Sequence, residues 1–205
     1  MAGRTRLIGA MLLAAALTPV PLGAQSEPQP PRIAVLATVG AMHPLDAGVR
    51  GLYEGPFVPV TVEADIRVAW KLFVFGGGQF IGKDGEVVFD QPPAPEERFP
   101  LRVSTASLRV GGGIAHPWQR WMFSAAAGLS YTHYREQWMS EEIPTVTGYT
   151  LGFTVGGGAD YRIFKRLWAV GRVEYAYTPM DETRQSFPTF DLSGVSVSGG
   201  VAVRF

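Results

Sequence analysis

The sequence predicts an all-β protein, an eight-stranded antiparallel up-and-down transmembrane β-barrel. Apolar and polar residues alternate along long segments, which is the two-residue period of a strand with two unlike faces. The connections between these segments alternate between short and long. Aromatic residues gather near both ends of the apolar face, as they do at the two interfaces of a membrane.

Residues 1–24 have the pattern of a signal peptide. Arg4 and Arg6 precede an apolar run, and small residues at Gly23 and Ala24 precede the expected cleavage point. The apolar run has about 11 residues, whereas a helix that anchors a protein in a bilayer needs about 20. We therefore expect cleavage rather than anchoring, with residues 25–31 as a short periplasmic leader and residues 32–205 as the barrel.

Eight strands follow from the alternation. It is clearest in VPVTVEADIRVAW, residues 58–70, where valines share one face and Glu63, Asp65 and Arg67 share the other. Each strand is long enough to cross a membrane at a tilt. The expected strands lie near 32–42, 57–69, 71–82, 101–115, 121–135, 147–162, 167–178 and 191–205.

The connections fall into two classes. Short turns at 70–71, 116–120 and 164–166 join strands two to three, four to five and six to seven. Such regular alternation predicts tight turns at one end of a barrel and loops at the other. Within the second long loop, residues 87–89 suggest a β extension above the membrane. The expected long loops are 43–55, 83–100, 136–145 and 179–190.

The composition of the polar face indicates which face points inward. A soluble secreted barrel that binds an apolar ligand would be apolar inside, whereas a membrane barrel is apolar outside. Here the polar face carries small residues and charges of both signs rather than lysines, and balanced pairs suit a narrow interior. We therefore favour the membrane barrel, with a narrow polar lumen and no large open pore. The predicted lumen charges are Glu63, Asp65, Arg67, Arg109, Asp160, Arg162, Arg172, Glu174 and Arg204.

Two aromatic girdles are predicted on the apolar face, with aliphatic residues between them. The girdle at the short-turn end comprises Trp70, Trp118, Trp121, Trp168 and Phe205. The girdle toward the long loops comprises Tyr131, Tyr149, Tyr175 and Tyr177.

Triple glycines occur at 76–78, 111–113 and 156–158, inside predicted strands. A phosphate-binding loop would need a helix and a suitably placed lysine after the glycines, and neither follows. In a narrow barrel, glycine permits bends and leaves room for opposing side chains in the lumen. We interpret the triplets in that way.

The last strand, SVSGGVAVRF, resembles the C-terminal assembly signal of bacterial outer-membrane barrels, which ends on phenylalanine, here Phe205. With the signal peptide and the alternating loops, the chain resembles the small eight-stranded bacterial outer-membrane β-barrel family over nearly its full length. The resemblance implies a location in the cell outer membrane, termini in the periplasm and loops outside. It also implies outer-membrane lipid, lipopolysaccharide and the barrel assembly machinery as partners. We expect a monomer with a structural or surface-interaction role.

Several chemistries are excluded or disfavoured. The zero formal net charge argues against a nucleic-acid binder, and the lack of cysteine removes thiolate chemistry. We expect no cofactor, no metal and no catalytic residues. The acidic loops suggest divalent ions near lipopolysaccharide, a partner protein, or simply solvated tips.

A lipid A-modifying enzyme is the alternative function. Some barrels of this size are lipid A deacylases or acyltransferases that use a histidine and a serine near the outer leaflet. His133 lies on the apolar face near the long loops, but the deacylase pattern places serine two residues later, where this chain has Arg135. Since no such pair is visible, we expect His133 to be an interfacial residue.

Overall fold

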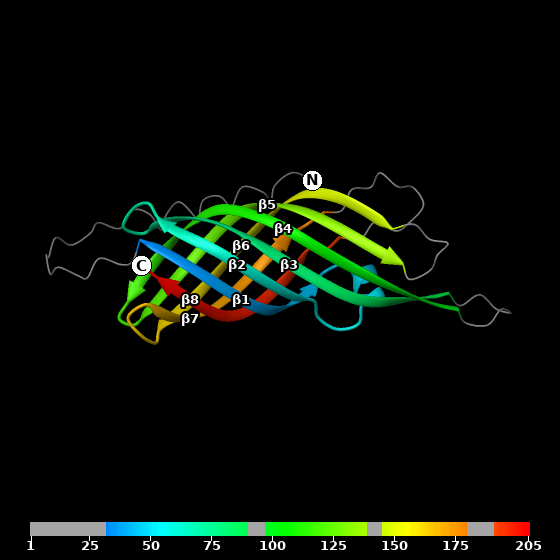
Figure 1. The fold of residues 1–205 in the computed structure, drawn as a ribbon, viewed down its shortest axis with the longest axis horizontal. Helices are drawn as coiled ribbons and strands as arrows, with labels where there is room; N and C mark the ends of the chain where they lie inside the picture. Colours follow the sequence, from blue (N-terminus) through cyan, green and yellow to red (C-terminus); the bar gives the residue numbers. More distant parts are fainter. Residues whose placement is uncertain (1–31, 90–96, 139–144, 180–190) are drawn as a thin grey trace, which may run out of the picture. The chain divides into compact units, whose positions relative to one another are not determined.

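The computed structural model describes residues 32–89, 97–138, 145–179 and 191–205. Eight strands form a closed antiparallel barrel in which each strand pairs with the next and β8 pairs with β1 (Figure 1). The predicted fold class is therefore confirmed. The expected signal peptide and leader, 1–24 and 25–31, lie outside the described residues. The strands are β1 Ile33–Pro44, β2 Val58–Arg67, β3 Leu72–Phe89, β4 Glu97–Trp118, β5 Trp121–Trp138, β6 Val146–Arg162, β7 Leu167–Tyr177 and β8 Gly194–Arg204.

The outer wall of the barrel is apolar. On β2, Val62 is 55% exposed, whereas Thr61 on the opposite face is 7% exposed. The same alternation runs along β8, where Val197 and Val201 face outward and Ala202 is buried. This orientation contradicts the soluble-barrel alternative, which needs its apolar residues inside.

The turns at one end are tight, as predicted, but one is tighter than expected. β4 and β5 remain paired as far as Trp118 and Trp121, so only Gln119 and Arg120 form the turn. Gln119 has a φ of 56°, in the left-handed region that a two-residue hairpin turn requires. The expected turn at 116–120 is therefore too long by the three residues that extend β4.

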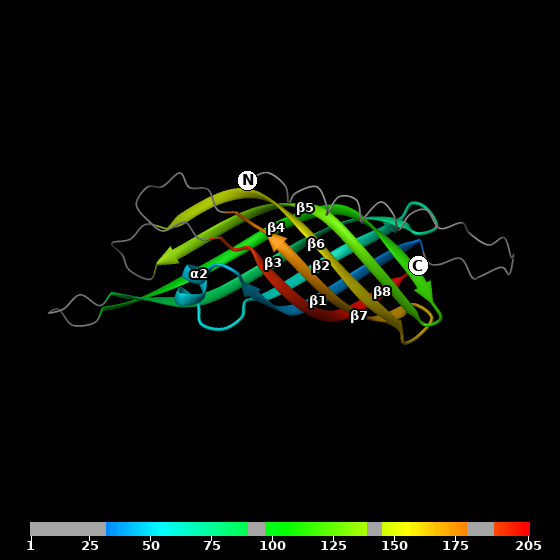
Figure 2. The ribbon, with the colours of Figure 1, turned by 180° about the vertical axis from the view of Figure 1, so that it is seen from behind.

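The expected loop at 83–100 is also largely strand. β3 and β4 stay paired up to Phe89 and Glu97. Their neighbours do not reach so far, because β2 starts opposite Gly82 and β5 ends opposite Leu101. We call residues 83–100 the arm; its described parts are 83–89 and 97–100. Figures 1 and 2 show β3 and β4 running on beyond the other strands. The β extension expected at residues 87–89 is present as paired strand. The charged residues beside it hid the rest of the extension, because in a two-stranded ribbon neither face needs to be apolar.

The expected loop at 43–55 contains a short helix, α2, Ala47–Leu52 (Figure 2). Asp46 caps it by accepting a hydrogen bond from the Val49 backbone N–H at 2.9 Å. The helix has six residues, too few to produce a helical period in the sequence.

Two apolar layers lie inside the barrel, one toward each end. The outer layer, which we call the cap, involves α2 and packs partly buried Leu52 and Trp138 against its core. The inner layer, which we call the floor, packs Phe73 against its core near the short turns. The core of the cap is Met42, Val49, Tyr53, Phe57, Ile81, Leu101, Val103 and Leu192. The core of the floor is Leu36, Ala115, Met122, Trp168, Val170 and Ala202.

The glycine triplets make room for bulky side chains inside the barrel. A Cβ on Gly111 would lie 2.6 Å from the Phe75 ring, and one on Gly113 would lie 2.7 Å from the Phe73 ring and against the Ala125 carbonyl. By contrast, a Cβ on Gly78 would meet its nearest atom at 3.7 Å, an ordinary contact. The inward glycines are therefore a packing requirement.

We predict that Gly113→Val destabilises the barrel by about 1–3 kcal/mol, because the side chain would overpack the floor beneath Phe73. The free energy of unfolding can be measured in urea on protein refolded into lipid vesicles. Gly78→Val is the matched control and should change it little. Equal losses in both variants would contradict a packing role for Gly113.

Candidate functional site

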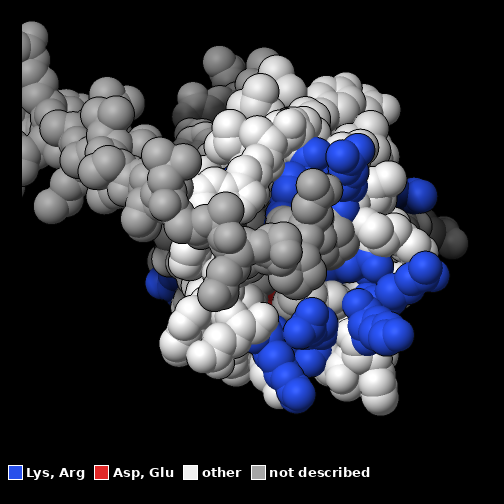
Figure 3. Space-filling model, turned by 90° about the vertical axis from the view of Figure 1, so that its left-hand side faces the viewer, with Lys and Arg blue, Asp and Glu red and all other residues white. Residues whose placement is uncertain are grey.

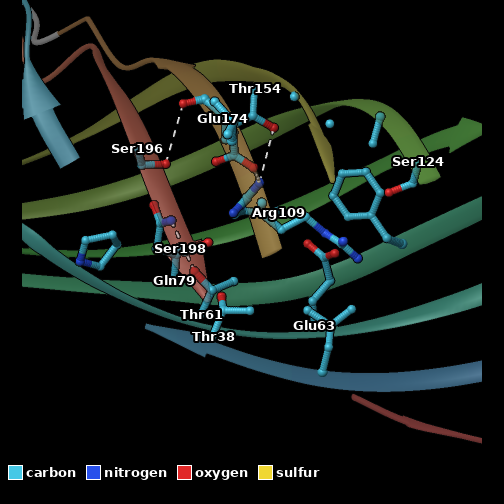
Figure 4. Close-up of a pocket in the computed structure, with 18 of the residues that line it drawn as sticks. Thr38, Thr61, Glu63, Gln79, Arg109, Ser124, Thr154, Glu174, Ser196 and Ser198 are labelled. Atoms are coloured by element: carbon cyan, nitrogen blue, oxygen red, sulfur yellow. Dashed lines mark hydrogen bonds and ion pairs between the residues drawn. The ribbon is translucent and has the colours of Figure 1, made fainter. Parts of the chain in front are cut away.

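An ion pair crosses the middle of the lumen. Arg109 of β4 is bonded to Glu174 of β7 and donates a further hydrogen bond of 3.4 Å to the Thr154 hydroxyl of β6. Figure 4 shows Arg109 directed toward both partners. The three residues come from three strands, so the contact ties opposite parts of the wall together.

A second cluster is centred on Asp160 of β6, whose side chain is fully buried. Arg172 and Arg204 both donate to its carboxylate. The Trp168 ring supports Arg204, whose guanidinium carbon lies 5.0 Å from the ring centroid. Gly158 provides the space for Arg172, since a Cβ there would collide with the guanidinium.

The remaining lumen charges are on β2. Glu63 and Asp65 both line the space beside Arg109 and Arg172, although no described cation lies within salt-bridge distance of either. Arg67 donates to the sulfur of Met122 at 3.5 Å. The acidic set Glu63, Asp65, Asp160 and Glu174 equals in number the basic set Arg67, Arg109, Arg172 and Arg204. The formal charges of these eight residues therefore balance, which limits the cost of burying them.

The polar part of the lumen encloses a cavity of about 60 Å³. It is lined by threonine and serine side chains in addition to Glu63, Arg109 and Glu174 (Figure 4). A water molecule needs at least 10–15 Å³ measured in this way, so the cavity has room for roughly four to six. With the cap on one side and the floor on the other, the described lumen offers space for water and not for a larger solute.

Two predicted site residues lie elsewhere. Arg162, predicted in the lumen, is exposed, because it is the last residue of β6 and leaves the closed part of the barrel. Trp168, predicted in the girdle, is 7% exposed and belongs to the floor. The prediction that Trp168 lies at the short-turn end of the barrel was right. The predicted face was wrong, because Trp168 shares the inward face of β7 with Val170 and Arg172.

The other girdle residues lie on the outer wall. Trp70, Trp118, Trp121 and Phe205 are exposed at the short-turn end. At the other end, Tyr131, Tyr149 and Tyr177 are exposed and Tyr175 is half-buried. Outward Phe123 and Phe153 were not predicted, although their alternation with smaller residues along a strand was an available signal. Exposed Phe164, in a short turn, was also missed and gave no such signal.

His133 lies in the aromatic girdle toward the long loops. Its ring is half-buried and stands 4.7 Å from the Tyr149 ring, which itself stacks on Tyr131 at 5.6 Å. Ser130 is 4% exposed and faces the lumen with Thr132. His133 and Ser130 therefore lie on opposite sides of the wall.

The cap joins the barrel mouth to the arm. Gly85 of the arm lies so close to Leu52 and Tyr53 that no larger residue fits, and Lys83 reaches the Pro56 carbonyl at 3.4 Å. Burial raises the pKa of the Tyr53 phenol, and the nearby Glu136 carboxylate raises it further. Tyr53 is therefore neutral at physiological pH and suits an apolar layer.

The acidic loops form no metal cluster in the described part of the chain, where no three His, Cys, Asp or Glu side chains gather closely enough. No helix among the described residues is long and apolar enough to cross a membrane. Most of the predicted loop 179–190 and residues 139–144 of the loop 136–145 lie outside the described residues.

Solved structures of outer-membrane barrels share this architecture. The Neisserial surface protein A has a TM-score of 0.57 and 13% identity, over 84% of this chain and 97% of that one. A major outer-membrane protein of Thermus thermophilus has a TM-score of 0.52 and 15% identity, over 84% and 99%. The N-terminal β-barrel domain of Pseudomonas aeruginosa OprF has a TM-score of 0.50 and 10% identity, over 86% and 100%.

The chain has the fold of the small eight-stranded outer-membrane β-barrels. No protein-family model and no curated protein sequence matches it. At these identities the likeness concerns the fold.

We predict that Asp160→Asn lowers the free energy of unfolding by about 3–5 kcal/mol, because it leaves two guanidinium groups without their carboxylate in the lumen. Urea unfolding in vesicles measures the loss. Asp84→Asn is the control, since its ion pair with Arg102 is exposed and 3.5 Å long, and we expect it to be silent. A silent Asp160→Asn would show that Arg172 and Arg204 do not depend on this carboxylate.

Proposed function

We propose that the protein is an integral outer-membrane barrel that acts as a closed anchor and presents the arm and neighbouring loops at the cell surface for interaction. The observation that carries the proposal is the combination of a filled lumen with a paired β arm that runs beyond the barrel. A lumen blocked by the cap, ion pairs and floor is unsuited to transport. The role then falls to the parts outside the membrane.

The location rests on the apolar outer wall with its two aromatic girdles, and on the outer-membrane origin of the similar structures. In this proposal the signal peptide 1–24 directs export, and the barrel assembly machinery recognises the last strand and Phe205. Outer-membrane lipid and lipopolysaccharide surround the wall of a monomer. The short turns face the periplasm.

We favour a non-enzymatic role over lipid A modification. The reason is the position of His133, which packs on Tyr149 while Ser130 points into the lumen. Nucleophilic catalysis would need the two side chains within hydrogen-bonding reach. A change in lipid A mass on deletion of the gene would favour the enzymatic alternative.

Cysteine labelling in intact cells tests the proposed topology, because the chain contains no native cysteine. Exposed Glu86 lies in the arm and exposed Lys165 lies in a short turn. We predict that Glu86→Cys reacts with a membrane-impermeant maleimide in intact cells, whereas Lys165→Cys reacts only after lysis.

The reverse labelling pattern would indicate that the barrel has the opposite orientation in the membrane, with the short turns outside. Equal reaction of both cysteines in the soluble periplasmic fraction would contradict membrane insertion. A gel-mobility shift between unboiled and boiled samples of each variant verifies that the barrel has folded.

A further inference from the structure

The short-turn end of the barrel is strongly basic. Figure 3 looks onto this end and shows Lys and Arg side chains spread over it. In the described part of the chain, every exposed Asp or Glu side chain lies toward the long loops, while Asp65 and Asp160 at this end are buried in the lumen. The exposed cations of this basic rim are Arg32, Lys71, Arg120, Arg162, Lys165 and Arg166.

Backbone pairing holds cations of the rim next to one another. The Arg162 N–H donates to the Arg120 carbonyl at 2.8 Å, so two guanidinium-bearing residues are direct neighbours across adjacent turns. Arg166 is bonded in the same way to Arg204, at 2.9 Å, but Arg204 is buried in the lumen and its charge is paired with Asp160. Like charges placed opposite each other across strands are unfavourable, and a bound anion would relieve the repulsion.

The basic rim lies level with the aromatic girdle at the short-turn end of the barrel. The Lys71 ammonium is 4.7 Å from the centroid of the Trp70 ring, and the Arg166 guanidinium is 5.7 Å from that of Phe205. Both rings are exposed on the apolar wall, where girdle aromatics meet lipid headgroups. Lys71 and Arg166 therefore lie against the outer wall of the barrel and not over its lumen. At this position they are within reach of lipid phosphates.

We propose that the basic rim binds the phosphate groups of anionic phospholipids in the leaflet that surrounds the short-turn end. Guanidinium and ammonium groups form charge-assisted hydrogen bonds with phosphate. The site comprises adjacent arginines on neighbouring turns, flanked by aromatic rings that contact the acyl-chain boundary. This inference rests on the proposed membrane location, which places the rim at the periplasmic leaflet.

A lipid explains the positions of the cations better than a soluble polyanion does. A polymer in the periplasm would need cations directed away from the membrane, and the cation–ring contacts hold Lys71 and Arg166 against the wall. Lipid phosphates meet the rim from the side, at the level of those rings.

Tryptophan fluorescence provides a probe confined to this end. Trp70, Trp118 and Trp121 are exposed on the wall near the rim, whereas Trp138 packs against the cap and Trp168 lies in the floor. Brominated lipids quench only tryptophans that they contact. Quenching in vesicles by brominated phosphatidylglycerol, relative to brominated phosphatidylcholine, therefore measures lipid preference at the rim.

We predict a preference for the anionic lipid of about fivefold or more at low ionic strength, from roughly one effective cation per headgroup. The preference should fall in high salt. The variant Lys71→Gln/Arg120→Gln/Arg162→Gln/Arg166→Gln, which includes both cations held against the wall, should reduce it to near unity. The control variant Arg102→Gln/Arg135→Gln removes exposed cations at the other end and should retain it.

Equal quenching of wild type by the two lipids would overturn the inference while leaving membrane insertion intact. Retention of the preference in the quadruple variant would also overturn it. Absence of quenching by either lipid, in protein that shows the gel-mobility shift, would overturn the proposed membrane location itself. Salt-sensitive binding of polyphosphate without a lipid preference would reassign the rim to a soluble polyanion.

Discussion

The narrow bore of an eight-stranded barrel is the constraint on which the rest of the structure depends. A closed sheet of this size encloses only enough space for its own side chains. The bulky inward rings of β3 therefore need small residues on the neighbouring strand. Phe73 and Phe75 fit because Gly111, Gly113 and Gly128 offer no Cβ to collide with their rings.

The narrow bore also limits how charged side chains can be placed in the lumen. Burying arginines in this narrow space is tolerated only when carboxylates compensate their charge, because an uncompensated buried charge is strongly destabilising. Asp160 meets this requirement for Arg172 and Arg204, and Glu174 does so for Arg109. The apolar cap and floor then separate this polar layer from the two ends. With its lumen filled, the barrel is suited to act as a platform, and its chemistry lies at its ends and on its wall.

Much of this was predictable because a barrel wall imposes a period of two. The alternation at 58–70 gave both the strand and its polar face, and the inward Glu63, Asp65 and Arg67 followed directly. Trp168 was misplaced because its position near a strand end was used without checking which face it shares with Val170. Arg162 was misplaced because the alternation of inward and outward residues no longer predicts burial at the last residue of a strand, where the barrel ends.

The cap and the arm were harder to predict from sequence. A six-residue helix such as α2 has no measurable period, and its apolar residues become a layer only when β1, β3 and β4 surround them. The arm contains charged residues because a ribbon outside the barrel has no interior. The basic rim was equally hidden, since Arg120 lies in the turn between β4 and β5, whereas Arg162 and Arg166 flank the turn between β6 and β7. Only the pairing of β5 with β6 brings these two turns together.

Single-channel recording is the most direct test of the central claim, that the lumen is closed by its own side chains. The refolded protein would be inserted into a planar lipid bilayer, with folding verified by gel mobility. We predict no stable conductance steps, because the cap, the ion pairs and the floor together leave room only for a few water molecules. Long-lived open steps in the wild-type protein would contradict it, and the barrel would then have to be regarded as a pore.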